Sequence, residues 1–509
     1  MIILTLLVLI LLLPSQLSAQ KEGYNWYFGK NAAISFNKTT ACISPPCPKN
    51  DSKIDTWEGC ATISDKDGNL LFYTDGVYVW NRFHKVMPNG NGLAGHPSST
   101  CSAVIIPKPN DSTKSIYYIF TADESPFFNP PNNGISYSIV DMSMCEDSGD
   151  VVQKNIFLYA PSTEKIAAVK HCNNKDFFII THEYDNNRFR TYRVTEDGVI
   201  RTPIYSRVGL DHGGNLLAYM GQIKVAPDSR HIAVAIRNQY AFQIFDFDNS
   251  TGAITNPVTL TLSPLQLTYG IEFSQDGSKF YGSANTTNPY RESYIYQWDL
   301  SAGNNTEIDN SKVRIAYDPL SSESFYAMQI GPNGKIYVAG DSKNYLGVVR
   351  YPNLKGTACY YEFAGLPLTK GFSQLGLPTF VSNYLAAPVT ISGAKNCICE
   401  GESITFTLNK IANSEYKWEA PGGFTLNTED TTITFNDPLP GTYKVTTYVF
   451  GCKTTIDTFD LTIVPYPVTD ITTDRPPVIC KGEWITMTTP YDENYDYEWT
   501  TVYDRKNSI

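Results

Sequence analysis

The stretch GCATISDKDGNLLFYTD (residues 59–75) decides the fold class. It consists of an apolar run, a turn built from Asp and Gly, and a second run rich in aromatic residues. Aromatic and β-branched side chains suit the half-buried surface of a strand, and Asp-Gly between two apolar runs is typical of a hairpin. The stretch therefore predicts a β-hairpin.

Similar hairpins recur between Trp57 and Tyr361. Clear copies are IKVAPDSRHIAVA (223–235), IEFSQDGSKFY (271–281) and MQIGPNGKIYV (328–338), and weaker ones begin at AVIIP (103–107) and AAVKH (167–171). The turns fall near Gly68, Ser112, Asn174, Ser229, Gly277 and Gly334, at spacings of 44 to 62 residues. Repeats of roughly 40–50 residues with several strands each are typical of propeller blades, whose small sheets bury their faces only by stacking radially.

We predict a β-propeller over residues 24–385, with seven blades and six as the alternative. Six blades are legible. The seventh is predicted to be composite, with Trp26–Phe36 from the start of the chain closed by Gln374–Phe380 from its end. Joining both ends in one blade would lock the ring.

A second repeat follows the propeller. CEGESIT (399–405) precedes YKW (416–418), and CKGEWIT (480–486) precedes YEW (497–499), with 19 residues from Cys to Trp in both copies and an offset of 81. This pattern predicts tandem immunoglobulin-like β-sandwich modules, the first over residues 390–466. A bridge between Cys399 and Cys452 is expected beside a core Trp418. The second copy, 467–509, lacks its later strands, and we expect the sequence to be a fragment of a longer protein.

Composition favours a globular β protein and excludes some partners. Aromatic residues make up 13% and charged residues 18%, and the net charge is −11. Because nucleic acids and anionic membranes attract basic surfaces, neither is an expected partner.

The first residues resemble an export signal. Ile2–Leu13 is an apolar run that is too short to span a membrane, and Ala19 offers a cleavage point, although no Lys or Arg precedes the run. We expect residues 1–19 to be a cleaved signal peptide, and the mature protein to be extracellular or on the outer-membrane surface with no direct membrane span.

Export permits disulfides, and the chain has 11 Cys. Cys42 and Cys47 flank a Pro-Pro pair and are predicted to close a small ring. Cys60 with Cys101, or Cys145 with Cys172, are alternatives for neighbouring strands, but spacing does not fix the connectivity.

These motifs resemble a family of exported Bacteroidetes proteins. The resemblance covers about residues 24–385 and 390–509, and its carriers include WYFG (26–29), EGCATISD (58–65), DGNLLFYTDGV (67–77), GHPSST (95–100), VKH (169–171), THE (181–183), FDFD (245–248) and SQLGLP (373–378). Such proteins join WD40-like propellers to PKD or immunoglobulin-like repeats. Many end in a gliding-motility-associated domain that acts as a type IX secretion sorting signal. This chain ends before any such domain, and the family implies no defined biochemical activity.

Candidate catalytic residues are few. His171 and His182 lie on consecutive expected strands, and a hairpin would bring them together, with Glu183 or His96, in a metal or acid–base site. Adjacent residues of a strand point to opposite faces, however, so the alternative is that these are hydrogen-bonded core or channel residues.

Other motifs favour structural roles. Residues 65–69 leave a structural calcium ion as an alternative to a plain turn, but no other cofactor is predicted. Asp75, Asp246, Asp248 and Asp299 are expected to cap turns, and Trp80, Tyr290 and Trp298 to pack between blades rather than stack on sugars. GHPSST (95–100) lacks the pattern of a nucleophile elbow.

The preferred interpretation is a binding and display protein, not an enzyme. Its propeller would present a face to a surface glycan or protein partner, on a stalk of sandwich repeats. One alternative is a propeller enzyme that acts on extracellular glycans as a hydrolase or lyase. Another is a structural component of gliding motility or secretion. The sequence gives no basis for an oligomeric state.

Overall fold

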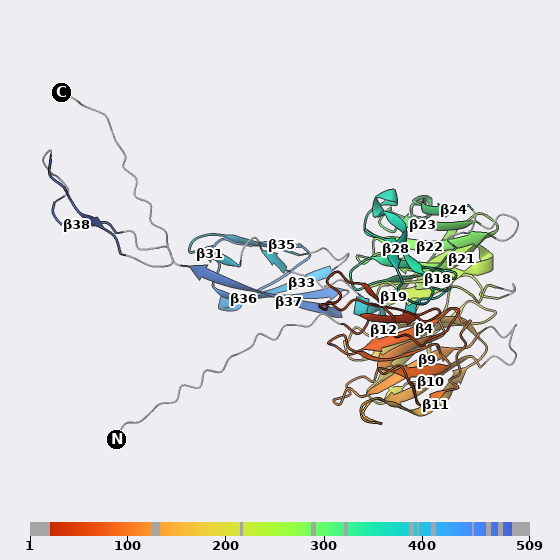
Figure 1. Ribbon diagram of the computed structural model, residues 1–509. Coiled ribbons are helices and arrows are strands. Elements are labelled where there is room, and N and C mark those ends of the chain that lie inside the picture. The colour runs from red at the N-terminus through yellow and green to blue at the C-terminus, as the bar shows by residue number, and fades with distance from the viewer. Residues whose placement is uncertain are drawn as a thin grey trace, which may run out of the picture. The chain divides into compact units, whose positions relative to one another are not determined.

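The computed structural model describes residues 21–490, except 125–132, 214–216, 287–291, 320–323, 386–390, 394–395, 409–413, 450–451, 465–469 and 477–481. The predicted signal peptide, Tyr290 and the last part of the second repeat lie outside the described residues. One compact unit takes in the chain up to Val389, and a second takes in most of the chain from Thr390 on. Almost every regular element is a strand (Figure 1).

The described residues of the first unit form seven sheets, and in six of them the strands follow one another antiparallel in sequence order from an inner strand outward. The first three sheets are β1 (Asn25–Phe28), β2 (Ala32–Ser35) and β3 (Cys47–Lys49); then β4 (Cys60–Ser64), β5 (Leu70–Thr74), β6 (Tyr78–Asn81) and β7 (Val86–Asn91); then β8 (Ala103–Pro107), β9 (Ile116–Ala122), β10 (Ile135–Asp141) and β11 (Asp150–Tyr159).

The fourth and fifth sheets are β12 (Ser162–Lys170), β13 (Phe177–Glu183), β14 (Arg188–Thr195), β15 (Gly198–Val199) and β16 (Ile204–Arg207); then β17 (Ile223–Val225), β18 (His231–Ile236), β19 (Ala241–Asp248) and β20 (Ala253–Thr261). The last two are β21 (Gln266–Phe273), β22 (Lys279–Thr286), β23 (Ser293–Asp299) and β24 (Val313–Asp318); then β25 (Phe325–Ile330), β26 (Ile336–Gly340), β27 (Tyr345–Val349) and β28 (Tyr361–Pro367). Helical turns are short: η1 (Arg237–Gln239), α1 (Asn305–Asn310), η2 (Gly356–Cys359) and η3 (Ser382–Leu385).

These sheets form a seven-membered propeller. Each inner strand contacts the next, from β1 and β4 through β8, β12, β17 and β21 to β25. The ring closes because Trp26 of β1 packs against Tyr337 of β26, with ring centroids 5.4 Å apart. The predicted turns join the first two strands of six sheets. Asn174, Ser229, Gly277 and Gly334 there have positive φ, which is why small or Asn residues recur.

The ends of the propeller meet, but not as predicted. β29 (Pro378–Thr379) pairs in parallel with β4 of the second sheet, so it does not complete the sheet of Trp26. β29 lies in the closing segment (residues 372–385), whose apolar side chains from Leu377 onward are buried among the inner strands. Pairing at the outer edge of the first sheet would leave those side chains half exposed, so burial decides the position.

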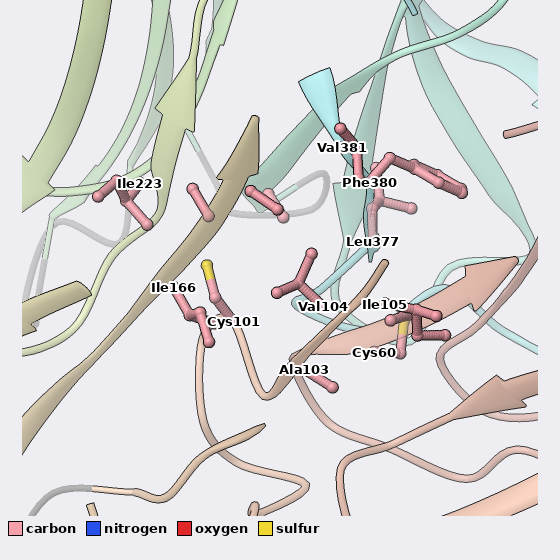
Figure 2. Close-up of a cluster of buried hydrophobic side chains, with 14 of the residues drawn as sticks. Cys60, Cys101, Ala103, Val104, Ile105, Ile166, Ile223, Leu377, Phe380 and Val381 are labelled. Carbon is pink, nitrogen blue, oxygen red and sulfur yellow. The ribbon is translucent and has the colours of Figure 1, made fainter. Parts of the chain in front are cut away.

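The centre of the ring is an apolar core. Figure 2 shows side chains of β4, β8, β12 and β17 gathered with Leu377, Phe380 and Val381 of the closing segment. Val381 also bridges to Ala168 of β12, and the Phe380 ring lies 5.9 Å from that of Trp26. The closing segment therefore ties the first, second and fourth sheets together.

The second unit contains a β-sandwich with η4 (Pro421–Gly423). Its sheets are β30 (Ile391–Gly393), β32 (Ile404–Leu408) and β35 (Thr432–Phe435); and β31 (Cys397–Cys399), β37 (Cys452–Val464), β36 (Gly441–Val449), β33 (Ser414–Ala420) and β34 (Phe424–Thr428). Trp418 is fully buried against Phe406, and the Tyr443 hydroxyl donates to the Leu439 carbonyl at 2.9 Å. A tyrosine that bonds back to the upstream backbone is a feature of immunoglobulin-like sandwiches.

The second repeat is described only in part. β38 (Thr472–Thr473) pairs with β39 (Met487–Thr488), much as β30 pairs with β32 about 81 residues earlier.

We expect Trp26→Ala to destabilise the propeller by about 3–5 kcal/mol, because it empties the contact that joins the first and last sheets. The midpoint of the propeller transition in calorimetry of the full chain measures the effect. Tyr351→Ala, at an exposed side chain, is the control and should change stability by less than about 0.5 kcal/mol. Equal shifts for both variants would contradict the closure contact.

Candidate functional site

The predicted histidine site does not form. In the pairing of β12 with β13, Ser162 faces Glu183 and Lys170 faces Phe177, so His171 lies at the turn and His182 at the far end. Along the hairpin, about six residues at ~3.3 Å per residue separate His171 from His182, which is a distance of roughly 20 Å. At the turn, His171 Nδ1 accepts the Asn173 N–H at 2.9 Å. The prediction that the hairpin brings these residues together was wrong, because they lie at opposite ends of the hairpin.

The remaining candidates have separate partners. Glu183 forms ion pairs with Arg188 and Arg190, both at 2.5 Å. His96 lies in a loop with its Nδ1 3.2 Å from Glu124 Oε2. Because each charged group is satisfied locally, the four candidates do not form one acid–base constellation.

His182 instead forms a buried stack with His212. Their ring centroids are 3.6 Å apart, both residues are fully buried, and His182 Nδ1 lies 2.7 Å from the Glu183 carbonyl oxygen. Burial lowers the pKa of His182 to about 3, and burial together with the neighbouring His182 and Lys165 lowers the pKa of His212. Both imidazoles are therefore neutral at pH 7.

We expect this stack to make the propeller acid-sensitive. Because both folded-state pKa values lie below the ordinary 6.5, the unfolded chain binds more protons, and stability falls as the pH drops from about 6.5 toward 3. His212→Gln should reduce that slope by ~1.4 kcal/mol per pH unit, as should His182→Gln. Denaturant unfolding between pH 7 and 4 measures the slopes, and wild-type slopes in both variants would refute the account.

The cysteines agree with the predictions in part. Cys42 and Cys47 form a disulfide. Cys60 and Cys101 are buried free thiols whose sulfurs lie apart in Figure 2, so that alternative bridge is absent. Burial raises the pKa of both thiols and makes them poor nucleophiles. Cys145 and Cys172 are also free.

The predicted Cys399–Cys452 bridge was also wrong. Cys399 is a free, exposed thiol that pairs beside Val464 at the end of β37, whereas Cys452 begins that strand. Along β37, twelve residues at ~3.3 Å per residue separate Cys452 from Val464, beside which Cys399 lies. A disulfide requires Cα atoms within about 7 Å, so the two cysteines are too far apart. The side chain of Cys452 lies outside the described residues.

Of the four acidic turn residues, Asp75, Asp248 and Asp299 accept backbone N–H groups as predicted, whereas Asp246 accepts from the side-chain amide of Asn256. Asp75 Oδ1 accepts the N–H groups of Val77 and Tyr78, and Asp248 accepts those of Ser250 and Thr251. Asp65 Oδ1 likewise accepts from Asp67 and Asn69, so this carboxylate oxygen already caps its own turn. Trp80 and Trp298 are buried. Among the described residues, no group of three His, Cys, Asp or Glu side chains converges as a metal site.

The structure reveals a polar cluster that the sequence did not predict. We define the carboxylate cluster as Glu58, Thr100, Glu164, Lys165 and Tyr269, which lie just before β4 and β8 and within the first halves of β12 and β21. Thr100 donates from its N–H at 3.0 Å and its hydroxyl at 2.5 Å to Glu164 Oε2. Lys165 Nζ donates to the carbonyls of Tyr219 and Met220, each at 2.9 Å. Residues remote in sequence thus meet where the inner strands begin.

Burial dominates the electrostatics of this cluster. It raises the pKa of Glu58, and together with the nearby charge of Glu58 it raises the pKa of Glu164. Burial also lowers the pKa of Lys165. The Glu58 carboxyl group and the Tyr269 hydroxyl are both buried, and they interact with each other and with Thr100. Tyr269 and Arg237 border Glu58, and the charge of Glu124 acts on it as well.

We expect Glu164→Gln to alter the pH dependence of stability near neutrality. A carboxyl with a raised folded-state pKa stabilises the fold below its ordinary 4.5, and this contribution is lost as the pH rises through the raised value. As the pH rises through that window, the free energy of unfolding of Glu164→Gln should increase relative to that of the wild type by up to ~1.4 kcal/mol per pH unit. Denaturant unfolding between pH 5 and 9 measures this difference.

Glu183→Gln is the control for this prediction. Burial opposes ionisation of Glu183, but hydrogen bonds from Arg188 and Arg190 prevail and lower its pKa. Its contribution therefore changes only at acid pH. If the free energies of unfolding of wild type and Glu164→Gln change with pH in parallel, the raised pKa of Glu164 beside Glu58 is contradicted.

A second site lies where the first, second and seventh sheets meet. We define the aromatic cleft as the cavity of about 420 Å³ lined by Lys30, Asp55, Thr56, Trp57, Ser342, Phe372 and Gln374. Trp57 and Phe372 are 57% and 47% exposed, although both are large aromatic residues. Clefts of some 300–1,000 Å³ with aromatic walls and a few polar groups are typical of small-molecule sites.

Backbone hydrogen bonds hold the walls of the cleft. Lys30 and Phe372 exchange two N–H···O bonds, each of 2.9 Å, and the Thr56 N–H donates to Gly29 at 3.1 Å. Gly29 has φ +52°, and a Cβ there would stand 2.3 Å from the Phe372 carbonyl oxygen. The close approach of the closing segment to β1 therefore requires glycine at this position.

The chain is thus an all-β protein whose seven-sheet propeller carries a ligand-sized cleft at the seam of its ring. Comparison with protein-family models finds no match, and neither does comparison with curated proteins. Among the described residues, none of the helices is both long and apolar enough to cross a membrane.

Solved structures include similar chains. A 6-phosphogluconolactonase candidate from Bacteroides fragilis is 10% identical with a TM-score of 0.35, covering 77% of this chain and 94% of its own. The periplasmic gluconolactonase of Pseudomonas aeruginosa is 9% identical, with a TM-score of 0.36 and coverages of 75% and 94%. The extracellular domain of a candidate hybrid two-component system from B. thetaiotaomicron is 15% identical, with a TM-score of 0.30 and coverages of 82% and 57%. Likeness at this level carries no inference about function.

Proposed function

We propose that the protein is an exported binding protein that holds its ligand in the aromatic cleft, with the sandwich repeats as a stalk. The observation that carries this proposal is the exposure of both Trp57 and Phe372 in the lining of one cavity. Exposing two large aromatic side chains has a cost in water that a bound partner would remove. The Cys42–Cys47 disulfide supports export, because disulfides persist mainly in oxidising compartments.

An enzyme that acts on extracellular glycans is the second candidate, and the carboxylate cluster favours it. Glycosidases use two carboxyl groups, one of which carries a raised pKa. In this cluster both carboxyl groups are buried, and Thr100 holds Glu164. A substrate would have to displace that contact, whereas the aromatic cleft is already open. The geometry therefore supports binding in the cleft better than catalysis in the cluster.

We expect the double variant Trp57→Ala/Phe372→Ala to lose ligand binding without loss of stability. Full-length wild type and variant would be applied to arrays of immobilised extracellular glycans and peptides. The variant should retain the wild-type melting temperature, because exposed side chains contribute little to folding.

The matched control is Tyr351→Ala/Tyr360→Ala, which removes two aromatic side chains of similar exposure elsewhere on the propeller. It should bind as the wild type does. Unchanged binding by the cleft variant, or equal loss in the control, would refute the cleft as the binding site.

A further inference from the structure

We propose that the ligand of the aromatic cleft is a neutral saccharide, with a pyranose ring against Trp57 or Phe372. This inference rests on the proposed function and assigns it a ligand class. The face of a pyranose is a patch of C–H groups surrounded by hydroxyls, so it needs an apolar ring beneath it and polar groups at its edge. The cleft supplies both kinds of group.

The polar edge includes an unused acceptor. Gln374 lines the cleft and is 93% buried, and its Oε1 accepts no hydrogen bond within the described part of the chain. A buried amide oxygen without a donor is unfavourable, and a hydrogen bond from a ligand hydroxyl would relieve that cost. The neighbouring Thr56 hydroxyl already donates to the Gly59 and Pro97 carbonyls. A ligand hydroxyl would therefore donate its hydrogen bond to Gln374 Oε1.

The charges of the cleft favour a neutral ligand. Lys30 and Asp55 line it together, and their backbones form an isolated bridge. One cation and one anion leave no excess charge to attract a polyanion or a polycation. Both groups hydrogen-bond hydroxyls well: the ammonium donates and the carboxylate accepts.

The shape of the cleft favours a saccharide over a folded protein partner. A protein interface of ordinary size covers about 800 Å² on each side, whereas the cleft is a concavity of about 420 Å³ lined by seven residues. Its walls are fixed by the backbone bonds of Lys30, Thr56 and Phe372. A preformed wall lowers the entropic cost of binding a small, rigid ring.

The test uses the full chain labelled with 5-fluorotryptophan, so that Trp57 reports binding directly. Trp57→Phe identifies its ¹⁹F resonance, and Trp484, which is 83% exposed in the second repeat, is the internal reference. Cellohexaose, mannohexaose, xylohexaose, maltohexaose and chitohexaose are titrated separately, with oligogalacturonate as the charged comparison.

At least one neutral oligosaccharide should shift the Trp57 resonance saturably and leave Trp484 unchanged. Gln374→Leu should weaken that binding about 3- to 10-fold, and Gln374→Glu, which keeps an acceptor oxygen, should retain more of it. Phe372→Ala should weaken it to a similar extent through loss of ring contact. Melting temperatures identify any variant that fails to fold, in which case Phe372→Leu or Gln374→Met replaces it.

A second arm separates failure of this inference from failure of the proposed function. Dodecapeptides selected by phage display on the full chain, and counter-selected on Trp57→Ala/Phe372→Ala, are titrated against the same resonance. If peptides shift Trp57 and no saccharide does, the cleft is a binding site and the saccharide assignment is wrong. If neither shifts it, both proposals fail. Tighter binding of oligogalacturonate than of every neutral sugar would also overturn the assignment.

Discussion

The structure depends on mutual burial of small sheets that are unable to cover their own faces. Among the described residues, each propeller sheet has at most five strands, and the inner strands are almost fully buried. β8 and β25 carry mostly apolar side chains, and β12 carries apolar side chains from Ile166 to Val169. Burial of apolar surface stabilises the fold by about 25 cal/mol per Å². Both faces of a sheet are buried only when the sheet has a neighbouring sheet on each side. A ring provides that arrangement, so the contact between the last sheet and the first determines whether the rest is stable.

The closing segment makes that contact and also creates the sites. Phe372 bonds to Lys30 across the seam, and further along the chain Phe380 packs on Trp26. The same path places Gln374 and Phe372 beside Trp57, so the aromatic cleft exists because the ends of the propeller meet there. The carboxylate cluster likewise exists only because β4, β8, β12 and β21 begin near one another in the ring. Closure and site formation are therefore one event.

Local features were predictable from the sequence, and the sites were not. Turns at Gly277 and Gly334 are determined within a few residues by chemistry that the sequence displays, and so is the small Cys42–Cys47 ring. Successive members of the carboxylate cluster are 42 to 105 residues apart in the sequence, and no spacing rule connects Glu58, Thr100, Glu164 and Tyr269. The histidine prediction failed because pairing register, which the sequence does not state, sets His171 and His182 at opposite ends of a hairpin. Trp57 was missed as a site residue because large aromatic side chains more often pack in the core.

Hydrogen exchange at the seam tests the account most directly. In the full chain, the amides of residues 24–36 and 372–381 should exchange as slowly as those of the inner strands β4 and β12, because closure opens only with global unfolding. Exchange mass spectrometry with peptide resolution measures this. Fast exchange of both seam segments, with the other sheets still protected, would show an open array instead of a closed ring and would contradict the account.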